Sequence, residues 1–166
     1  MPNCLRIIAL CLGLGPLAAL AQTSGAEVAF GSFKGDPTLP VEVTADQLQV
    51  NQTDGTAVFT GNVVVIQGQM RLTAPLVKVD YAQDRKAIAR LDASGGVTLV
   101  NGGEAAESET AIYTIDSGEV VMTGNVLVTQ GSSALSGNQL TVDLNTGTGM
   151  MQGRVQTVFV PGAAAP

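Results

Sequence analysis

The sequence of 166 residues carries 8 Lys and Arg against 14 Asp and Glu, for a net charge of −6, and contains neither histidine nor tryptophan. The absence of histidine excludes the usual zinc sites and a histidine general base. A nucleic-acid surface needs clustered cations, and only Arg85 and Lys86 are adjacent in the chain, so the composition argues against nucleic acid as a partner.

Residues 1–21 have the features of a secretory signal peptide. A positively charged start precedes an apolar run over residues 7–21, which is shorter than the roughly 20 residues needed to span a bilayer and ends in an A-x-A motif. We expect cleavage before Gln22 and export across the inner membrane; an uncleaved anchor is the alternative. Cys4 and Cys11 would leave with this peptide, so the mature chain would have no thiol.

Residues 22–40 are rich in Gly, Pro and small side chains, which predicts a flexible leader. Phe30 and Phe33 in this leader are either a partner-binding element or loosely packed, and loose packing is favoured. Residues 41–160 are long enough for one domain with its own hydrophobic core. Residues 161–166 form a short C-terminal tail.

An internal repeat dominates this domain. Residues 57–81 align without gaps with residues 120–144 at a constant offset of 63, and 11 of the 25 positions are identical. Repetition at fixed spacing indicates a stacked supersecondary unit, because one copy cannot bury its apolar face alone. We therefore expect an elongated scaffold with a long apolar seam.

A shorter pattern recurs inside the repeat: apolar, polar, apolar, then Asp or Asn, as in a strand closed by a turn. Each copy returns to a glycine-marked bend followed by valine, where positive φ is permitted. The strands are 48–51, 77–80, 113–116 and 140–143, and the bends are Gly61-Asn62, Gly95-Gly96, Gly124-Asn125 and Gly153-Arg154. No run from Val41 to Val160 has a helical period, so the region is predicted to be all β.

The strands after the bends alternate strictly, so Val97 and Leu99 share one face, as do Val126 and Val128. Two sheets facing each other through such residues would make a sandwich or jelly roll with an apolar interior about 10 Å thick. Periodicity alone leaves open whether this interior is filled by side chains or forms a groove.

Carboxylates are the remaining candidates for catalysis, because glycoside hydrolysis needs only a pair of them. Asp80, Asp116 and Asp143, however, fall at repeated strand ends, where Asp commonly bonds its own backbone in a turn. Nucleotide-binding glycine motifs are absent. We predict no enzymatic activity, no cofactor and no metal site.

Residues 58–68 (VFTGNVVVIQG), preceded by 45–48 and echoed by 121–126, resemble the OstA-like family, and residues 154–161 resemble the end of its domain. The resemblance covers about residues 41–161. It implies a twisted β-jelly roll of two antiparallel sheets, V-shaped in cross-section and open at both ends, with an apolar trough for lipid acyl chains. It also implies end-to-end joining of domains through edge strands.

The function expected from this resemblance is that of a periplasmic lipopolysaccharide-binding bridge protein, which shields acyl chains during transport from the inner to the outer membrane. Its partners would be lipopolysaccharide, the OstA-like domains of inner- and outer-membrane transport components, and further copies of itself. A secreted β-solenoid structural or adhesive protein without lipid cargo is the alternative. A related OstA-like domain that is anchored in the inner membrane is a further alternative.

The inward-facing apolar positions are the candidate trough residues, and ordinary core packing is the alternative for each. They are Val41, Val43, Leu48, Val50, Phe59, Val63, Val65, Val77, Val79, Leu99, Tyr113, Ile115, Leu140 and Val142. The resemblance implies lipid contact for Val41, Val43, Leu99, Tyr113 and Ile115. The expected assembly edges are Val41 and Val43 at one end and Val158 and Val160 at the other.

Overall fold

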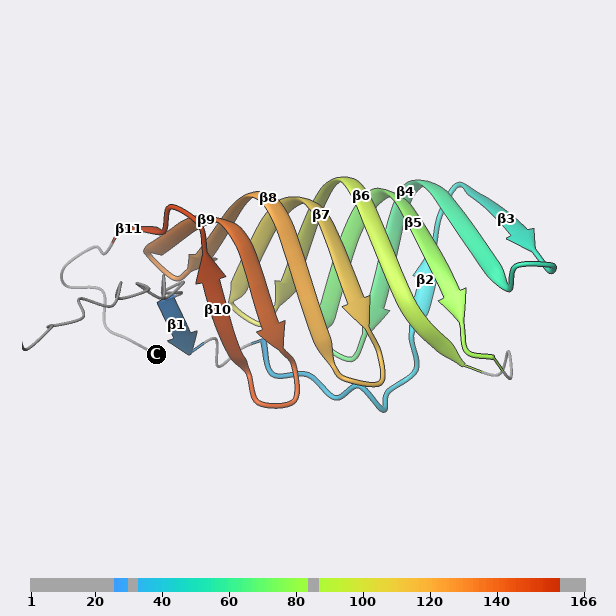
Figure 1. Cartoon of the computed structure of the whole chain (residues 1–166), viewed down its shortest axis with the longest axis horizontal. Helices are drawn as coiled ribbons and strands as arrows, with labels where there is room; N and C mark the ends of the chain where they lie inside the picture. The colour runs from blue at the N-terminus through green and yellow to red at the C-terminus, as the bar shows by residue number, and fades with distance from the viewer. Residues whose placement is uncertain (1–25, 30–32, 84–86, 159–166) are drawn as a thin grey trace, which may run out of the picture.

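The computed structural model describes residues 26–29, 33–83 and 87–158 of the chain (Figure 1). This described part contains strands and no α-helix, and therefore no helix long and apolar enough to cross a membrane. The all-β prediction is confirmed. The strands are β1 (Ala26–Ala29), β2 (Glu42–Thr44), β3 (Gln47–Asn51), β4 (Thr56–Gln67), β5 (Met70–Tyr81), β6 (Ile88–Asn101), β7 (Glu104–Thr114), β8 (Glu119–Gln130), β9 (Ser133–Asp143), β10 (Thr148–Gln152) and β11 (Gln156–Val158).

All of these strands belong to one antiparallel sheet with the order β1-β10-β9-β8-β7-β6-β5-β4-β2. At one end, β2 pairs with residues 64–66 of β4 while β3 pairs with residues 56–60 of the same strand. At the other end, β10 and β11 likewise pair with different halves of β9. The sheet is therefore open at both ends, and its antiparallel hairpins do not match the parallel coils of a β-solenoid.

The six long strands bend midway, along the upper side of the molecule in Figure 1. At each bend the pairing register shifts, and β4, β6 and β8 carry one extra residue there, as in a β-bulge. The bends divide the sheet into two layers, which makes the two sheets of the predicted jelly roll halves of one continuous sheet. The first layer ends at the turns 52–55, 115–118 and 144–147, and the second ends at the turns 68–69, 102–103 and 131–132.

The four glycine-marked bends lie where the sequence predicts them. Asn62 and Asn125 both have φ of 46°, and each follows a glycine that also has positive φ. Gly95 and Gly96 have φ of 93° and 98°, and Arg154 has φ of 50° after Gly153. These are left-handed conformations, which Gly and Asn adopt at lower cost than other residues.

The corners of the two repeat copies are built alike. The Asn62 side chain donates a hydrogen bond to Asp46 (Nδ2 to Oδ2, 2.8 Å), and that of Asn125 donates one to Glu109 (Nδ2 to Oε1, 2.7 Å). Asp46 and Glu109 are themselves 63 residues apart, so the repeat extends beyond the segment with visible identity. The offset of 63 therefore reflects two equivalent corners, two hairpins apart in the sheet.

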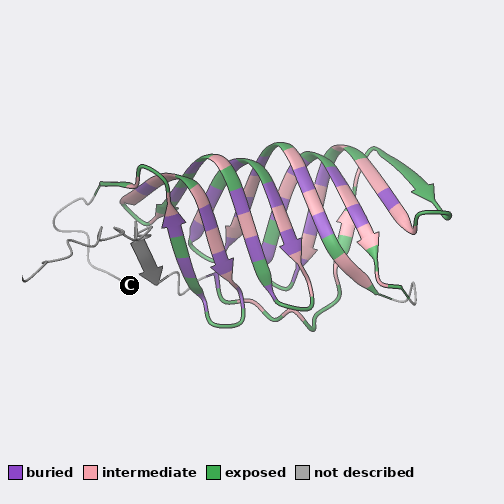
Figure 2. Cartoon of the chain, viewed as in Figure 1, coloured by how far each residue is buried: buried purple, intermediate pink, exposed green. Residues whose placement is uncertain are grey.

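The hydrophobic core lies between the two layers, and buried and more exposed residues alternate along most strands (Figure 2). In β4 the inward positions keep one parity through the bend, as in Ala57, Val63 and Val65. In β5 the parity changes, so that Ala74 and Val77 both face inward. The extra residue in β4 explains this difference, because only one of two paired strands is lengthened at the corner.

Candidate functional site

The apolar interior between the layers is the candidate functional site. Eight of the predicted trough residues are buried in its single core cluster: Val63, Val65, Val77, Val79, Leu99, Tyr113, Leu140 and Val142. Val41, Val43, Phe59 and Ile115 are partly buried and pack against this cluster. The structure thus gathers twelve of the fourteen residues along one seam, with contributions from both layers.

Sequence reasoning missed other inward-facing residues of the same seam. Leu72 and Leu91 pair across the sheet with Leu99 and Val79, which are themselves predicted trough residues. Others are Ala74, Ala93, Ala106, Ala111, Val120, Met122 and Leu135. Strand alternation could have identified most of these residues. In β5, β7 and β9, however, alternation counted from one half of the strand gives the wrong face for the other half, because the inward parity changes at the bend. Val97, Val126 and Val128 also lie in the seam, on the faces that strand alternation gave them.

The interior is filled in this structure. The eight buried residues are at most 1% exposed, so side chains from the two layers exclude water along the seam. When no lipid lies between them, the apolar inner faces of the two layers pack on each other, because each Å² of apolar surface removed from water stabilises the fold by about 25 cal/mol. The trough is therefore a closed seam in this state. Strand alternation left open whether the interior is filled or forms a groove, and the resemblance implied a groove, so the filled interior differs from that expectation.

The seam continues past the covered core at the β3 end. Leu48 and Val50 are 57% and 58% exposed, although their partners on β4 are Phe59 and Ala57, which face the interior. A shallow hollow beside them is lined by Val50, Thr56 and Tyr81 among others. These two residues are exposed because no strand lies beyond β3 in the described sheet, and Figure 2 shows this strand as an exposed end.

The predicted assembly edges lie at opposite ends of the sheet. Val43 is in β2 and Val41 directly precedes it. Val158 is in β11 and is 62% exposed, whereas Val160 lies outside the described residues. Among the described strands, β2 and β11 each pair on one side only.

A polar cluster lies opposite the bends, where the two layers end. The Tyr113 hydroxyl in the first layer donates a hydrogen bond of 2.6 Å to Gln67 Oε1 in the second. Burial raises the pKa of the Tyr113 phenol to about 12, and the hydrogen bond to Gln67 offsets only part of this. Asn101 and Glu104 are also buried there, and Gln130 donates a hydrogen bond to Glu104. Strand alternation identified Tyr113 but had no means of identifying Gln67, Asn101 and Glu104.

Residues 33–40, expected to be part of a flexible leader, lie against this cluster. Phe33 is 0% exposed and belongs to the core, so the interpretation of this side chain as loosely packed is wrong. Gln67 Nε2 donates to the carbonyl oxygens of Pro37 (3.0 Å) and Leu39 (2.9 Å). Upstream, β1 pairs with β10. Phe30 lies outside the described residues.

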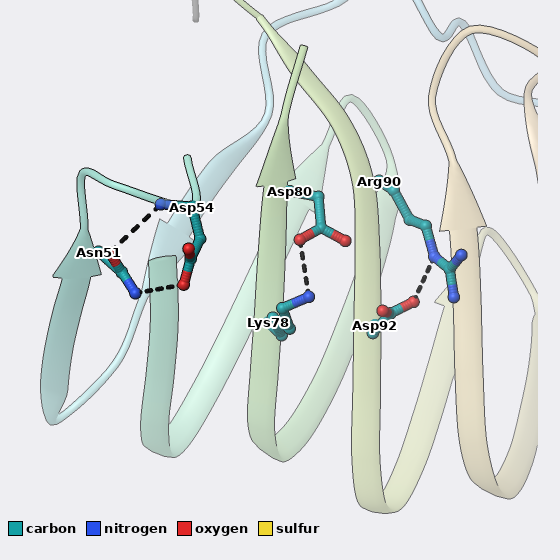
Figure 3. Close-up of polar contacts among 6 residues, drawn as sticks. All are labelled: Asn51, Asp54, Lys78, Asp80, Arg90 and Asp92. Atoms are coloured by element: carbon teal, nitrogen blue, oxygen red, sulfur yellow. Dashed lines mark hydrogen bonds and ion pairs between the residues drawn. The ribbon is translucent and has the colours of Figure 1, made fainter. Parts of the chain in front are cut away.

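The outer face of the first layer carries paired charges. Lys78 Nζ lies 2.8 Å from Asp80, and Arg90 Nε lies 2.6 Å from Asp92, on neighbouring strands (Figure 3). Lys78 is also the register partner of Asp92, and Asp80 of Arg90, which gives a neutral square of alternating charges. The turn-capping interpretation is therefore wrong for Asp80.

Asp143, in contrast, does cap a turn, as the sequence predicts. Asp143 accepts a hydrogen bond from the backbone nitrogen of Asn145 (2.8 Å), which lowers the pKa of its carboxyl. At the β3 end the turn is capped by Asn51, whose Oδ1 accepts from the backbone nitrogens of Thr53 (3.0 Å) and Asp54 (3.3 Å) and whose amide nitrogen donates to the Asp54 carboxylate (Figure 3). Among the described residues, no group of three or more acidic side chains is placed to hold a metal ion.

Comparison with known proteins agrees with this geometry. The family model described as LptA/(LptD N-terminal domain) LPS transport protein matches residues 42–148. An uncharacterized protein of Rhizobium meliloti (strain 1021) is 30% identical over 155 residues, which cover 87% of this chain and 82% of that protein. The lipopolysaccharide export system protein LptA of Escherichia coli (strain K12) is 26% identical over 113 residues, covering 64% of this chain and 61% of that protein.

The crystal structure of LptH, described as the LptA homologous periplasmic component of the lipopolysaccharide transport device of Pseudomonas aeruginosa, shares the fold. Its TM-score is 0.68 at 21% identity, and the match covers 76% of this chain and 99% of that one. The predicted twisted jelly-roll fold is thus confirmed. Together with the family match over residues 42–148, these findings show that the chain belongs to the LptA/(LptD N-terminal domain) LPS transport protein family.

Proposed function

We propose that this protein binds lipopolysaccharide in the periplasm and shields its acyl chains between the two layers during transport from the inner to the outer membrane. The observation that carries the proposal is the continuous apolar seam of an open-ended sheet in a chain of this family. The family consists of non-enzymatic transport components, which confirms the prediction that the chain is not an enzyme.

The physical need for such a seam follows from the cost of exposing lipid tails to water. Each methylene moved from water to an apolar surface gains about 0.8 kcal/mol, so several acyl chains cannot cross an aqueous space unshielded. A seam that runs the length of the sheet lets the lipid slide while it stays covered. The protein would be a passive conduit, with the driving force supplied by a partner.

Because the seam is filled in this structure, acyl chains must enter as the layers separate. The contacts that they replace are apolar, such as those of Leu99 and Val79, so one apolar partner is exchanged for another. The hydrogen bond between Tyr113 and Gln67, in contrast, joins the layers directly and must break. The acidic net charge of −6 suits recognition through the tails rather than the phosphates.

The ends of the sheet support end-to-end assembly with OstA-like domains of membrane components or with further copies. The free edges at β2 and β3 offer unpaired backbone groups to an incoming strand. Leu48 and Val50 would then be covered by the added domain, and the apolar seam would continue into it. We also propose that residues 1–21 are a signal peptide, cleaved before Gln22, which would deliver the protein to this compartment.

Photo-crosslinking tests the proposal. We expect a benzophenone side chain at Phe59 or Leu99, on the inner face, to capture lipopolysaccharide in cells. The matched controls are Val58, the outward neighbour of Phe59 on β4, and Thr98, the outward neighbour of Leu99 on β6; both should capture little. Equal capture at inward and outward positions would contradict binding between the layers.

A further inference from the structure

A short segment crosses the ends of the two layers opposite the bends, and runs along the lower side of Figure 1 between β1 and β2. We define residues 33–40 as the strap. Its adjacent residues Lys34 and Gly35 bond to opposite layers. Asn101 of the second layer donates to the Lys34 carbonyl oxygen (3.4 Å), and the Gly35 nitrogen donates to the carbonyl oxygen of Leu144, at the end of the first layer (2.8 Å).

We propose that the strap holds the seam shut in the lipid-free protein and must swing away before an acyl chain can enter. This inference rests on the proposed function and adds a gate to it. The strap would be an internal competitor of the cargo, because it occupies both the apolar interior and the opening that leads to it.

Phe33 is the part of the strap that occupies the interior. Its side chain is fully buried in the core cluster formed by the two layers. An aromatic ring of this kind buries on the order of 150 to 250 Å² of surface, similar to a segment of an acyl chain. Phe33 and a lipid tail therefore compete for apolar surface of the same kind.

Gln67 acts as the latch. Its amide nitrogen donates to two strap carbonyl oxygens, those of Pro37 and Leu39, and its amide oxygen accepts from the Tyr113 hydroxyl. One side chain thus joins the strap, the second layer and the first layer. If the strap is released, the Gln67 amide nitrogen loses both of its acceptors. The Gln67 side chain is then less well held in the position from which its oxygen accepts the hydrogen bond of Tyr113.

The rest of the strap is suited to movement. Lys34, Asp36, Thr38, Leu39 and Pro40 are exposed, and none of the strands in the described part of the chain pairs with this segment. A turn keeps its shape: Asp36 Oδ1 accepts from the Thr38 nitrogen (3.0 Å), and its carbonyl oxygen accepts from the Leu39 nitrogen (3.2 Å). A segment with little buried surface of its own opens at lower cost than the strands that flank it.

A reversible disulfide tests this gate. A Cβ placed on Gly35 would lie 3.7 Å from the Cβ of Leu144, which suits a disulfide, and Gly35 has no positive φ. The chain contains only Cys4 and Cys11, so replacing both with Ser in the full chain leaves Gly35→Cys and Leu144→Cys as its only thiols. The same protein under reducing conditions is the matched control, since it carries the same loss of the Leu144 side chain.

The readout is the rate and extent of uptake of fluorophore-labelled lipopolysaccharide. We expect the oxidised protein to take up the probe at least tenfold more slowly than the reduced protein, and dithiothreitol to restore uptake. Equal uptake in both redox states, with binding by the wild-type chain intact, would overturn the gate alone. Absence of binding by the wild-type chain would overturn the proposed function, and the gate with it.

A second variant decides the matter if the cysteine pair binds no probe in either redox state. Gln67→Glu keeps an oxygen for the Tyr113 hydroxyl but replaces the amide donor that holds the strap. We expect uptake severalfold faster than in the wild-type chain. Unchanged or slower uptake in this variant would overturn the gate.

Discussion

The corner glycines of the repeat allow a prediction in which backbone strain and steric conflict can be separated. Gly124 has φ of 88°, and a Cβ added there would lie 2.6 Å from Glu109 Oε2 and 2.8 Å from the Cβ of Glu109. The backbone conformation alone costs a residue with a side chain about 1 to 2 kcal/mol. Moving the Glu109 carboxylate also breaks its hydrogen bond from Asn125, which adds about 1 kcal/mol. We therefore expect Gly124→Ala to lower the free energy of unfolding by about 2 to 3 kcal/mol.

Gly96 is the matched control for this substitution. It occupies the equivalent bend in β6 with φ of 98°, but a Cβ there would meet no atom within 4 Å. Gly96→Ala should therefore show the backbone cost of about 1 to 2 kcal/mol alone. Urea unfolding followed by far-ultraviolet circular dichroism is the suitable assay, because the chain has no tryptophan.

A double-mutant cycle then isolates the steric part. In a Glu109→Gly background the carboxylate and the Cβ of residue 109 are both absent, so Gly124→Ala should cost no more than Gly96→Ala does in the wild-type chain. The reasoning is refuted if Gly124→Ala and Gly96→Ala are equally destabilising in the wild-type chain. It is also refuted if removing the Glu109 side chain leaves the cost of Gly124→Ala unchanged.

Three further predictions concern the interior and the ends of the sheet. Leu99→Ala should lower the free energy of unfolding by about 2 to 5 kcal/mol in urea, because Leu99 is fully buried; a cost below about 1 kcal/mol would show that the layers do not pack tightly there. The free energy of unfolding should fall by up to about 2.7 kcal/mol as the pH rises from 10 to 12. The reason is that the pKa of the Tyr113 phenol is near 10 in the unfolded chain but about 12 in the folded protein. Below pH 10 the phenol is neutral in both states, so it contributes no pH dependence there. The unfolding midpoints of Tyr113→Phe should therefore lack this fall between pH 10 and 12. Val158→Pro in the edge strand β11 should weaken end-to-end association, and an unchanged oligomer size by light scattering would count against strand addition there.

The trough residues show which inward-facing positions strand alternation can predict and which it cannot. It identified Val63, Val65 and Leu99 because each follows a bend whose glycine marks where the alternation restarts. It missed Leu72, at the start of a strand whose parity changes at Pro75, where no glycine marks the bend. It also included Leu48 among the covered residues, because the pattern of a strand does not say whether the opposite layer extends over it.

The sequence by itself determined the class of the fold and the position of its corners, because both depend on local chemistry. Alternating β-branched residues favour strands, and Gly-Asn allows the left-handed conformation that a bend needs. Only the tertiary structure decided that the seam is closed and that Phe33 fills part of it. Only the tertiary structure brought Tyr113 to Gln67, 46 residues away. These features depend on how closely two distant layers approach each other, and that distance is set by the packing of all their side chains together rather than by any one segment.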